Sequence, residues 1–495
     1  MSRAVARQDI ALARTLIESN ATSQRFISIE SGRACCLDPQ LFARESALVR
    51  STYIERHAIG KAAGHGKERR RQKGWFRLLS LWTAWGKKAA IDTVVLPTGQ
   101  VISQSSVINY EALKFHSSKL RVAETDDKLG EAFISRFGRT FPVHSCPVPS
   151  EAIIEKCLLR ALSSAPGPDG LPYDAWRAAG LNGTRALGAV MRWCLQGLPA
   201  PLHFGDNKAI FIPKSSYDSD GASHCRTLDN LRMLGLKNTD NKIICTAIAY
   251  CLRPALALGA AMSQRGFVAG RQLVANAVEL DAHARCHGTP LNAKRMPALA
   301  LFAFADAFPS VAHSWIQQSC VAARLPAGII KFIMVMYNST YIVGGASEHA
   351  FARAVLRGVI QGCPLSGAVF VCAINPLLVC LEKYVEQSSH GKARATADDI
   401  GFSLTDLESL KIIFEVYQVF QAVSALYFKV AKCCLIPTAE KFSESVASSI
   451  GDWLGRNLPD WSGFKVVPYA KYVGIVLGPA AGKTFADGRE REQHT

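Results

Sequence analysis

Hydrophobic residues recur at helical spacing in two parts of the chain. The first pattern consists of Trp75, Leu78, Leu79, Trp82 and Trp85. This spacing predicts an amphipathic helix, and the residues before it are strongly basic. The second pattern predicts a helix that begins after Ser150, a residue type suited to the N-cap, and that has Ile154, Leu158 and Leu162 on one face.

Other stretches have the pattern of strands and turns. The unbroken apolar run Ala298–Ala305 predicts a buried strand, which turns at Asp306–Val311 toward a helix. A short hairpin is predicted over Asp92–Ser103, around Pro97-Thr98-Gly99. The segment Ser163–Pro172 is rich in proline and glycine, which predicts a rigid loop between helices. Near the other end, Asp398 and Asp399 precede Ile-Gly-Phe, a pattern typical of a hairpin tip.

Composition and charge narrow the possible classes of partner. The chain has 495 residues, of which 49% are hydrophobic and 20% charged, values typical of a globular protein of about three domains. Its formal net charge is +17, which favours a polyanionic partner, nucleic acid before membrane. The run Lys61–Lys88 is especially basic, and Lys67–Lys73 could contact nucleic acid or direct nuclear import. Alternatively, the helix packs its aromatic face on a neighbouring element.

Cysteine usage and hydropathy indicate a soluble, intracellular protein. The 15 cysteines include no Cys-x-x-Cys pair, so a zinc ribbon is not expected and we interpret them as reduced thiols. The N-terminus lacks the apolar core of a signal peptide. The apolar stretch Val369–Leu381 is broken by Asn375-Pro376 and is too short to span a bilayer, so no membrane association is expected.

The adjacent carboxylates Asp398 and Asp399 suggest a cation site. Neighbouring anions repel, and Mg²⁺ commonly binds one or two carboxylates together with substrate phosphates. The chain has a second such pair at Asp126 and Asp127, within a polar run where a solvated turn explains it. An Asp-Asp pair by itself is therefore weak evidence for a metal, and its sequence context has to support it.

That context resembles one enzyme family. Ala-Pro-Gly-Pro-Asp-Gly at 165–170 resembles the opening block of reverse transcriptases from non-LTR (LINE-type) retrotransposons. Further blocks that resemble the family's occur in the family's order over about residues 90–478: Ala209–Lys214, Leu231–Leu236, Asn241–Ile244, Gln264–Arg271, Arg357–Ser366 and Tyr472–Gly478. The pair Asp398-Asp399 falls where the family has its Ala-Asp-Asp turn, with Thr396 in place of the usual aromatic residue.

The resemblance implies a role for each matching residue. In the family, residues at the positions of Lys214 and Arg232 reach the incoming triphosphate, and the aromatic at Phe308 excludes the ribose 2′-hydroxyl. Gln361 and Gly362 belong to the loop facing template and nucleotide, where Gly358 and Gly362 would let backbone come close to a ligand. The remaining implied roles are metal binding and catalysis for Asp398 and Asp399, proton donation to pyrophosphate for Lys432, and primer grip for Tyr472 and Gly474.

The chain departs from the family at one important position. The first metal-binding aspartate should lie five residues before Phe308, and that position holds Ala303. Asp306 is close by, but a shift of three residues along a strand reverses the direction of the side chain. Asp306 serves as a substitute metal ligand only if a bulge or an early turn redirects it. A smaller departure is Met233, where the family usually has proline.

We therefore expect an α+β, right-hand polymerase fold with fingers and palm, and with the thumb truncated or absent. The expected division is 1–60 poorly structured, 61–150 basic aromatic helix and linker, 151–290 fingers, 291–440 palm with nucleotide and metal site, and 441–495 primer-grip hairpin and start of the thumb. The expected activity is RNA-directed DNA polymerisation with Mg²⁺ or Mn²⁺, an RNA template, a DNA primer and dNTP, in the nucleus or cytoplasm. Ala303 is expected to impair it. The alternatives are a catalytically inactive nucleic-acid-binding relative and, third, a basic scaffold with no nucleic-acid role.

Overall fold

The computed structural model describes residues 27–30, 33–36, 91, 93–162, 164–214, 225–287, 295–344, 351–439 and 441–481. The basic aromatic helix predicted within Lys61–Lys88 lies outside these residues. The chain forms two compact units, Met1–Lys88 and Ala89–Thr495. In the first unit, β1 (Ile27–Glu30) pairs antiparallel with β2 (Arg33–Cys36).

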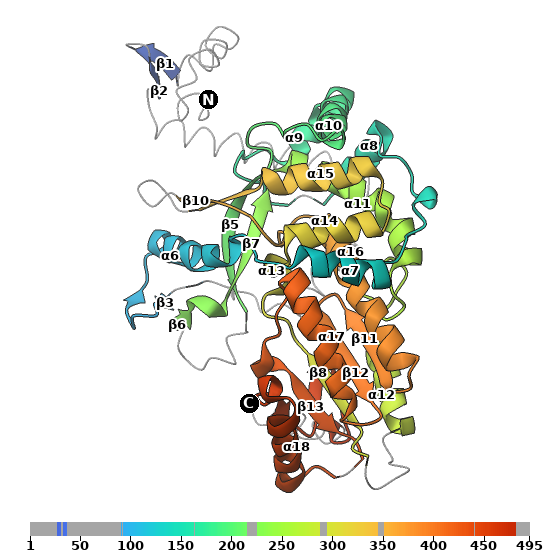
Figure 1. Ribbon diagram of the computed structural model, residues 1–495. Helices are drawn as coiled ribbons and strands as arrows, with labels where there is room; N and C mark the ends of the chain where they lie inside the picture. Colours follow the sequence, from blue (N-terminus) through green and yellow to red (C-terminus); the bar gives the residue numbers. More distant parts are fainter. Residues whose placement is uncertain are drawn as a thin grey trace, which may run out of the picture. The chain divides into compact units, whose positions relative to one another are not determined.

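The second unit is built around a five-stranded sheet in the order β11-β12-β8-β13-β14 (Figure 1). Its strands are β8 (Ala298–Phe302), β11 (Gly391–Thr396), β12 (Asp399–Leu404), β13 (Cys434–Pro437) and β14 (Lys465–Val466). The apolar run near 298 is therefore a strand, as predicted, and every residue of β8 is buried. Strands β12 and β13 pair antiparallel with its two edges, and separate hydrophobic clusters cover its two faces, which explains why it has no polar face.

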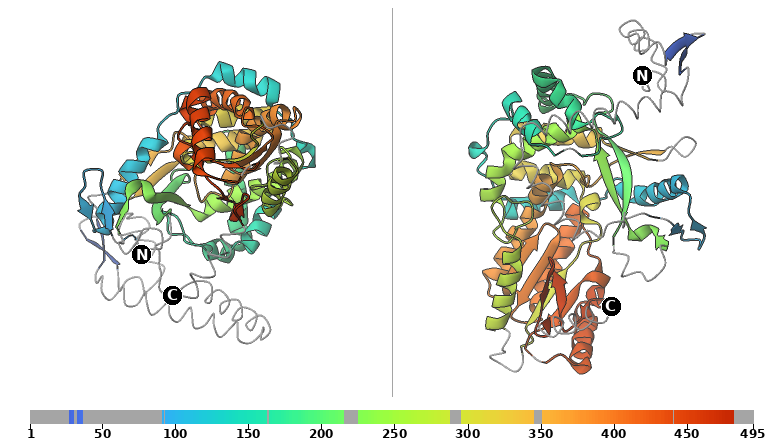
Figure 2. Two further views of the ribbon diagram at one scale, coloured as in Figure 1. Left: turned by 90° about the horizontal axis from the view of Figure 1, so that it is seen from below. Right: turned by 180° about the vertical axis from the view of Figure 1, so that it is seen from behind.

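Different elements cover the two faces of this sheet. Ala300 and Phe302 belong to the main core, which includes α17 (Ser409–Ser424). Leu299 and Leu301 belong to a separate cluster with α12 (Val274–His287) and the hairpin of β15 and β16. Figures 1 and 2 show α17 and α12 on opposite sides of the strands. Alternating residues of one strand thus pack against two layers.

A second sheet has the order β10-β9-β5-β7, and its long strands β5 and β7 are antiparallel. A small sheet, β4-β3-β6, contains the hairpin predicted over Asp92–Ser103. A second hydrophobic core joins these sheets to α6 (Ser105–Ser117). The strands are β3 (Thr93–Val95), β4 (Val101–Ile102), β5 (Asp206–Pro213), β6 (Cys225–Thr227), β7 (Leu231–Lys237), β9 (Tyr341–Gly344) and β10 (Phe351–Ala354).

The remaining elements surround these sheets. The α-helices are α7 (Asp127–Phe137), α8 (Glu151–Arg160), α9 (Tyr173–Ala178), α10 (Gly180–Leu195), α11 (Thr239–Gly259), α13 (Ala307–Ser310), α14 (His313–Ala322), α15 (Ala327–Asn338), α16 (Ser366–Leu381) and α18 (Glu444–Asn457). The 3-10 turns are η1 (Ser118–Leu120), η2 (Val143–Ser145), η4 (Leu228–Asn230), η7 (Val430–Lys432) and η8 (Pro459–Trp461), and η6 (Glu382–Glu386) is a π-turn. A short hairpin consists of β15 (Ala470–Tyr472) and β16 (Ile475–Leu477). Helices and sheets are thus segregated, as in an α+β fold.

Two details of the sequence prediction were wrong. Leu162 does not belong to the buried face of α8: the helix ends at Arg160, the following residue is extended, and Leu162 is 89% exposed. Asn375-Pro376 does not interrupt the apolar stretch near 370, because Pro376 lies inside α16. The Asn375 side chain accepts a hydrogen bond from the Ala261 N–H and is satisfied within the core.

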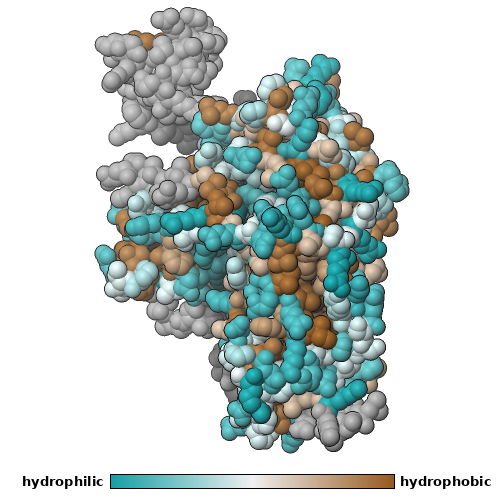
Figure 3. Space-filling model, in the orientation of Figure 1, coloured by the Kyte–Doolittle hydropathy of each residue, from teal (hydrophilic) through white to brown (hydrophobic). Residues whose placement is uncertain are grey.

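Within the described residues, two helices are long and apolar enough to cross a membrane by length and composition alone, Thr239–Gly259 and Ser366–Glu386. Both are largely buried inside the molecule, so the hydrophobic core also explains their composition. On the face drawn in Figure 3, polar residues separate the exposed apolar residues into smaller groups.

Candidate nucleotide and nucleic-acid site

The carboxylates Asp398 and Asp399 lie at a hairpin tip, as the pattern predicted. Strands β11 and β12 pair up to Thr396 and Asp399, and Ala397 and Asp398 form the two-residue turn between them. Ala397 has φ +56°, the left-handed conformation that such turns require. The buried side chain of Gln264 stabilises this conformation of Ala397 through two hydrogen bonds to its backbone. Its Oε1 accepts from the Ala397 N–H at 2.9 Å, and its Nε2 donates to the Ala397 carbonyl at 3.2 Å.

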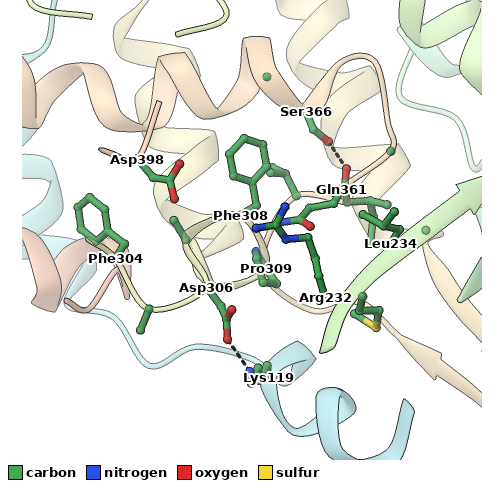
Figure 4. Close-up of a pocket in the computed structure, with 18 of the residues that line it drawn as sticks. Lys119, Arg232, Leu234, Phe304, Asp306, Phe308, Pro309, Gln361, Ser366 and Asp398 are labelled. Carbon is green, nitrogen blue, oxygen red and sulfur yellow. Dashed lines mark hydrogen bonds and ion pairs between the residues drawn. The ribbon is translucent and has the colours of Figure 1, made fainter. Parts of the chain in front are cut away.

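A large pocket opens between this hairpin and the sheet of β5 and β7 (Figure 4), with a cavity volume of about 1320 Å³. It gathers residues separated by more than 200 positions in the sequence. The predicted site residues that line it are Lys214, Arg232, Phe308, Gln361, Gly362, Asp398, Asp399 and Lys432, together with Ala303 and Asp306. These residues come from three of the ordered sequence blocks, from the Asp-Asp turn, from Lys432 and from the segment that follows β8.

The two predicted primer-grip residues lie elsewhere. Tyr472 is not part of the pocket lining and is only 3% exposed, with its hydroxyl 3.1 Å from the Arg394 carbonyl and 3.3 Å from the Asp399 carbonyl. It therefore supports the Asp-Asp hairpin from within. Gly474 is in the turn of the β15–β16 hairpin, with φ +88° and open space beside it.

Position 303 is next to the carboxylate pair. In the register of β12 on β8, Ile400 is opposite Phe302, so one further step brings Ala303 opposite Asp399. Opposite residues of antiparallel strands project to the same side. The Ala303 backbone is fixed there, because its carbonyl accepts from the Lys429 N–H at 2.8 Å. A carboxylate at this position would face the pair, and alanine leaves that space without a ligand.

Asp306 is directed elsewhere. It has φ +48° and precedes α13, and its two carboxylate oxygens bind Lys119 Nζ at 2.5 Å and Lys214 Nζ at 3.0 Å. Figure 4 shows the carboxylate directed toward Lys119 and away from Asp398. Burial raises the pKa of Asp306, but the hydrogen bonds and charges of Lys119 and Lys214 outweigh it and leave the pKa well below the usual range.

The pKa values of Asp398 and Asp399 are raised, in contrast to that of Asp306. Burial raises the pKa of Asp398, while its own backbone N–H and the charge of Arg232 counteract this. Loss of hydration inside the pocket and the neighbouring charge of Asp398 raise the pKa of Asp399 to about 6, against the effect of Lys432, although its outer edge is exposed to solvent. Among the described residues, no salt bridge reaches either carboxylate within 4.0 Å, whereas Asp306 has two.

The loop Arg357–Ser366 differs from the prediction in one respect. Gly358 and Gly362 have φ +80° and +118°. A Cβ on Gly358 would lie 2.4 Å from the Pro309 backbone, and one on Gly362 would lie 2.5 Å from the Gly235 carbonyl oxygen. Both glycines are thus required for contact with protein backbone, a role that the sequence did not indicate, and their approach to a ligand stays a prediction. The pocket that these contacts shape is still lined by Gly362.

Phe308 and Gln361 are held by their neighbours in this pocket. The Phe308 ring stacks on Phe370, with ring centroids 4.6 Å apart, and meets the Phe267 ring edge-on. The Gln361 carbonyl accepts from the Gly235 N–H at 2.9 Å, which joins this loop to β7. Lys432 lines the same pocket, where burial and the charges of Lys429 and Lys214 lower its pKa.

The sequence prediction missed two residues that shape the pocket. Lys119 enters it from η1, which had been assigned only to a linker, and no spacing rule connects it to Asp306 187 residues away. Gln264 fell inside a recognised block, but its role became evident only from its bonds to Ala397. A lysine in a segment without a recognised block is too common to have been singled out.

The donor set at the hairpin fits one hard cation through two carboxylates. Asp398 and Asp399 are adjacent, share a pocket and have pKa values that a nearby positive charge would lower. No cluster of three His, Cys, Asp or Glu side chains suited to a metal ion occurs within the described part of the chain. Because Ala303 supplies no ligand and Asp306 is paired with lysines, a third carboxylate is lacking.

Comparison with known proteins supports the family resemblance of the ordered sequence blocks. Residues 212–458 match the family described as reverse transcriptase (RNA-dependent DNA polymerase). The chain is 24% identical over 448 residues to the transposon TX1 uncharacterized 149 kDa protein of Xenopus laevis, covering 82% of this chain and 32% of that protein. It is also 24% identical over 282 residues to the retrovirus-related Pol polyprotein from type-2 retrotransposable element R2DM of Drosophila melanogaster, covering 55% of this chain and 25% of that protein.

The chain thus spans a third or less of the length of these relatives. Among solved structures, an apo telomerase from Candida tropicalis truncated from its C-terminal domain overlaps 56% of this chain and 54% of its own, with 11% identity and a TM-score of 0.37, too low to support an argument. The family match and the retrotransposon relatives agree with the ordered sequence blocks. The chain belongs to the reverse transcriptase family of non-LTR, LINE-type retrotransposons.

Proposed function

We propose that this chain is the RNA-directed DNA polymerase domain of a LINE-type retroelement, with fingers over 151–290, palm over 291–440 and a primer-grip hairpin within 441–495. The single observation that supports this most is the pocket, which brings the residues of the ordered blocks to one place. In this assignment the β5–β7 sheet belongs to the fingers, and the sheet around β8 and β12 forms the floor of the palm. The basic residues of Lys61–Lys88 would contribute to nucleic-acid binding.

The substrates that fit this pocket are a dNTP and the 3′-end of a DNA primer paired with an RNA template. Lys214 and Arg232 would neutralise the triphosphate, and Lys432 would donate a proton to the departing pyrophosphate. Phe308 is positioned by Phe370 to form a flat wall, which would exclude a ribose bearing a 2′-hydroxyl. Nucleotide addition is an in-line phosphoryl transfer, so the residues act mainly by holding the reacting oxygens in place.

Asp398 and Asp399 would hold Mg²⁺ or Mn²⁺. When bound, the cation would supply charge neutralisation for the reacting oxygens. With Ala303 in place of a third carboxylate, we propose that polymerase activity is impaired. A catalytically inactive, nucleic-acid-binding relative is the second candidate, favoured by the pairing of Asp306 with two lysines. Either function places the protein on nucleic acid in the nucleus or cytoplasm, with no membrane involved.

Primer extension separates the two candidates. The purified chain, an RNA template, a DNA primer and dNTPs are incubated with Mg²⁺ or Mn²⁺, and Asp398→Ala serves as the control. Extension that depends on Asp398 supports the polymerase, even if it is weak. RNA binding without extension in either metal supports the inactive relative. Absence of both activities contradicts the proposed function.

A further inference from the structure

Lys119 is fixed in the pocket by a segment outside the family's catalytic blocks. Helix α6, which precedes it, packs in the second hydrophobic core together with β5 and β7. The turn η1 is then joined to the loop that leads into Arg357–Ser366. The Leu120 carbonyl accepts from the Leu356 N–H at 2.9 Å, and the Lys119 carbonyl accepts from Arg357 Nε at 2.6 Å. The backbone position of Lys119 is therefore fixed independently of the ion pair between its side chain and Asp306.

The ion pairs at this end of the pocket form a cradle for an anion. One Asp306 oxygen binds Lys119 and the other binds Lys214, and the exposed fractions of the three side chains are 26%, 21% and 31% for Lys119, Lys214 and Asp306. Lys432 and Arg232 line the same pocket. Two ammonium groups that bind the two oxygens of one carboxylate present the arrangement that also binds the oxygens of a phosphate.

We infer that Lys119 is a phosphate-binding residue of the nucleotide site, and that Asp306 occupies the place of a phosphate group until a polyphosphate displaces it. This inference rests on the proposed function, because Lys214 is the residue assigned there to the triphosphate. It adds a third cation, from the segment before the fingers, and a competing anion supplied by the chain itself. A ligand with several phosphate charges outcompetes a single carboxylate because it engages all the cations at once.

This arrangement has a specific consequence for variants of Asp306. If Asp306 competes with phosphate, its neutral isostere frees both lysines and polyphosphate binds more tightly. If Asp306 only positions the lysines, the same substitution loosens them and polyphosphate binds more weakly. The sign of the effect therefore distinguishes competition from support. A gain in affinity also cannot result from misfolding.

The test is the affinity of the full chain for inorganic tripolyphosphate, measured by calorimetry at moderate salt. Asp306→Asn is expected to lower Kd about tenfold, which corresponds to about 1.4 kcal/mol. Lys119→Gln is expected to raise Kd by a similar factor and to remove the gain when combined with Asp306→Asn. Lys114→Gln is the matched control, since Lys114 is on α6, pairs with Glu111 and does not line the pocket. Lys119→Arg keeps the charge and should retain binding.

An unchanged or higher Kd for Asp306→Asn overturns the competition, and a Lys119→Gln variant that matches Lys114→Gln overturns the role of Lys119. Arg232→Gln tests the proposed nucleotide site separately, because Arg232 is assigned to the triphosphate and is not part of the ion pairs with Asp306. If it leaves Kd unchanged while the Lys119 and Asp306 variants respond as expected, the anion site stands and its assignment to the nucleotide fails. If tripolyphosphate binds neither the unmodified chain nor Asp306→Asn, the inference itself fails.

Discussion

Position 303 determines how many carboxylates the pocket can offer to one cation. Ala303 directly follows strand β8, and the register of β12 on β8, continued by one residue, brings it opposite Asp399. With alanine there, Asp398 and Asp399 remain as a pair whose charges repel each other, without a described cationic side chain close enough to form a salt bridge. At the scale of single residues, the proposed site thus combines the groups predicted to face the substrate with one position that lacks the expected carboxylate.

The repulsion within this pair should appear in the pH dependence of stability. The folded-state pKa of Asp399 is raised from 3.8 to about 6, so the folded protein binds this proton more tightly than the unfolded chain does. Ionisation of Asp399 therefore costs stability, increasingly from about pH 4 to pH 6 and fully above that. Asp399→Asn should raise Tm at pH 7.5 and lose this advantage toward pH 4. If the Tm of Asp399→Asn differed from that of the unmodified protein by the same amount at pH 7.5 and pH 4, the raised pKa of Asp399 would be contradicted.

Phe308 should determine which sugar the pocket accepts. In the unmodified protein, a dNTP should raise Tm more than the matching rNTP, because the ring blocks a 2′-hydroxyl. Phe308→Ala removes this wall and should narrow the difference between the two ligands to about zero. The substitution also removes the stacking on Phe370 and lowers the ligand-free Tm, so each ligand is compared with the same variant without ligand. Equal shifts in the unmodified protein would argue against a preserved pocket.

Residues with a role inherited from the family blocks could be located from the sequence, because each block fixes its own spacing. Lys214, Arg232, Phe308 and Asp398 all line one pocket as a result. Lys119 could not be located in this way. Its place depends on the packing of α6 against the β5–β7 sheet, a contact between distant parts of the chain that no local pattern encodes.

At the scale of elements, side chains from other parts of the chain stabilise the turn of the β11–β12 hairpin. Gln264 is completely buried and bonds to the Ala397 N–H and carbonyl and to the Gly266 N–H. Tyr472 reaches the backbone on either side of the turn. These contacts hold Ala397 at positive φ and so determine where Asp398 projects.

Gln264→Ala should therefore destabilise the protein well beyond the loss of one side chain. It leaves buried backbone groups of Ala397 and Gly266 without partners, at a cost of about 1–3 kcal/mol for each. The free energy of unfolding in urea should fall by at least that amount for one group. Gln418→Ala, an exposed position on α17, should change it by less than about 0.5 kcal/mol. Similar values for the two variants would show that Gln264 does not hold the turn.

Element boundaries were predictable where local chemistry sets them and not where tertiary packing does. The 92–103 hairpin and the Asp-Asp turn follow from their turn residues, and β8 follows from its length and apolar content. Pro376 was misjudged because a proline can be accommodated within a helix that the core surrounds. The contact of Gly358 with the backbone of Pro309, 49 residues earlier, could not be predicted, because no local pattern indicates it.

At the scale of the whole molecule, the net charge of +17 predicts nucleic-acid binding dominated by phosphates. The logarithm of duplex affinity should fall with the logarithm of salt concentration, by about 0.9 for each phosphate neutralised. Fluorescence anisotropy from low to physiological salt measures this slope. A flat response would contradict phosphate-driven binding and would favour a scaffold without a nucleic-acid role.

The same titration distinguishes the two interpretations of the basic run before the second unit. A variant with the cationic residues of Lys67–Lys73 replaced by glutamine should have a smaller slope if this run contacts nucleic acid. An unchanged slope would instead favour the interpretation in which the segment leads into a helix that packs on a neighbouring element. A variant with Lys114→Gln controls for a general loss of charge.

The most direct test of the proposed function is primer extension by Ala303→Asp. If this chain is a reverse transcriptase limited by a missing carboxylate, the variant should extend a DNA primer on RNA in Mg²⁺ at least about tenfold faster than the unmodified chain, a gain of about 1.4 kcal/mol in transition-state stabilisation. Ala303→Asn, which has a similar shape without the charge, should give no gain, and Asp398→Ala should abolish it. A folded Ala303→Asp variant that extends no faster than Ala303→Asn would contradict the single-residue explanation.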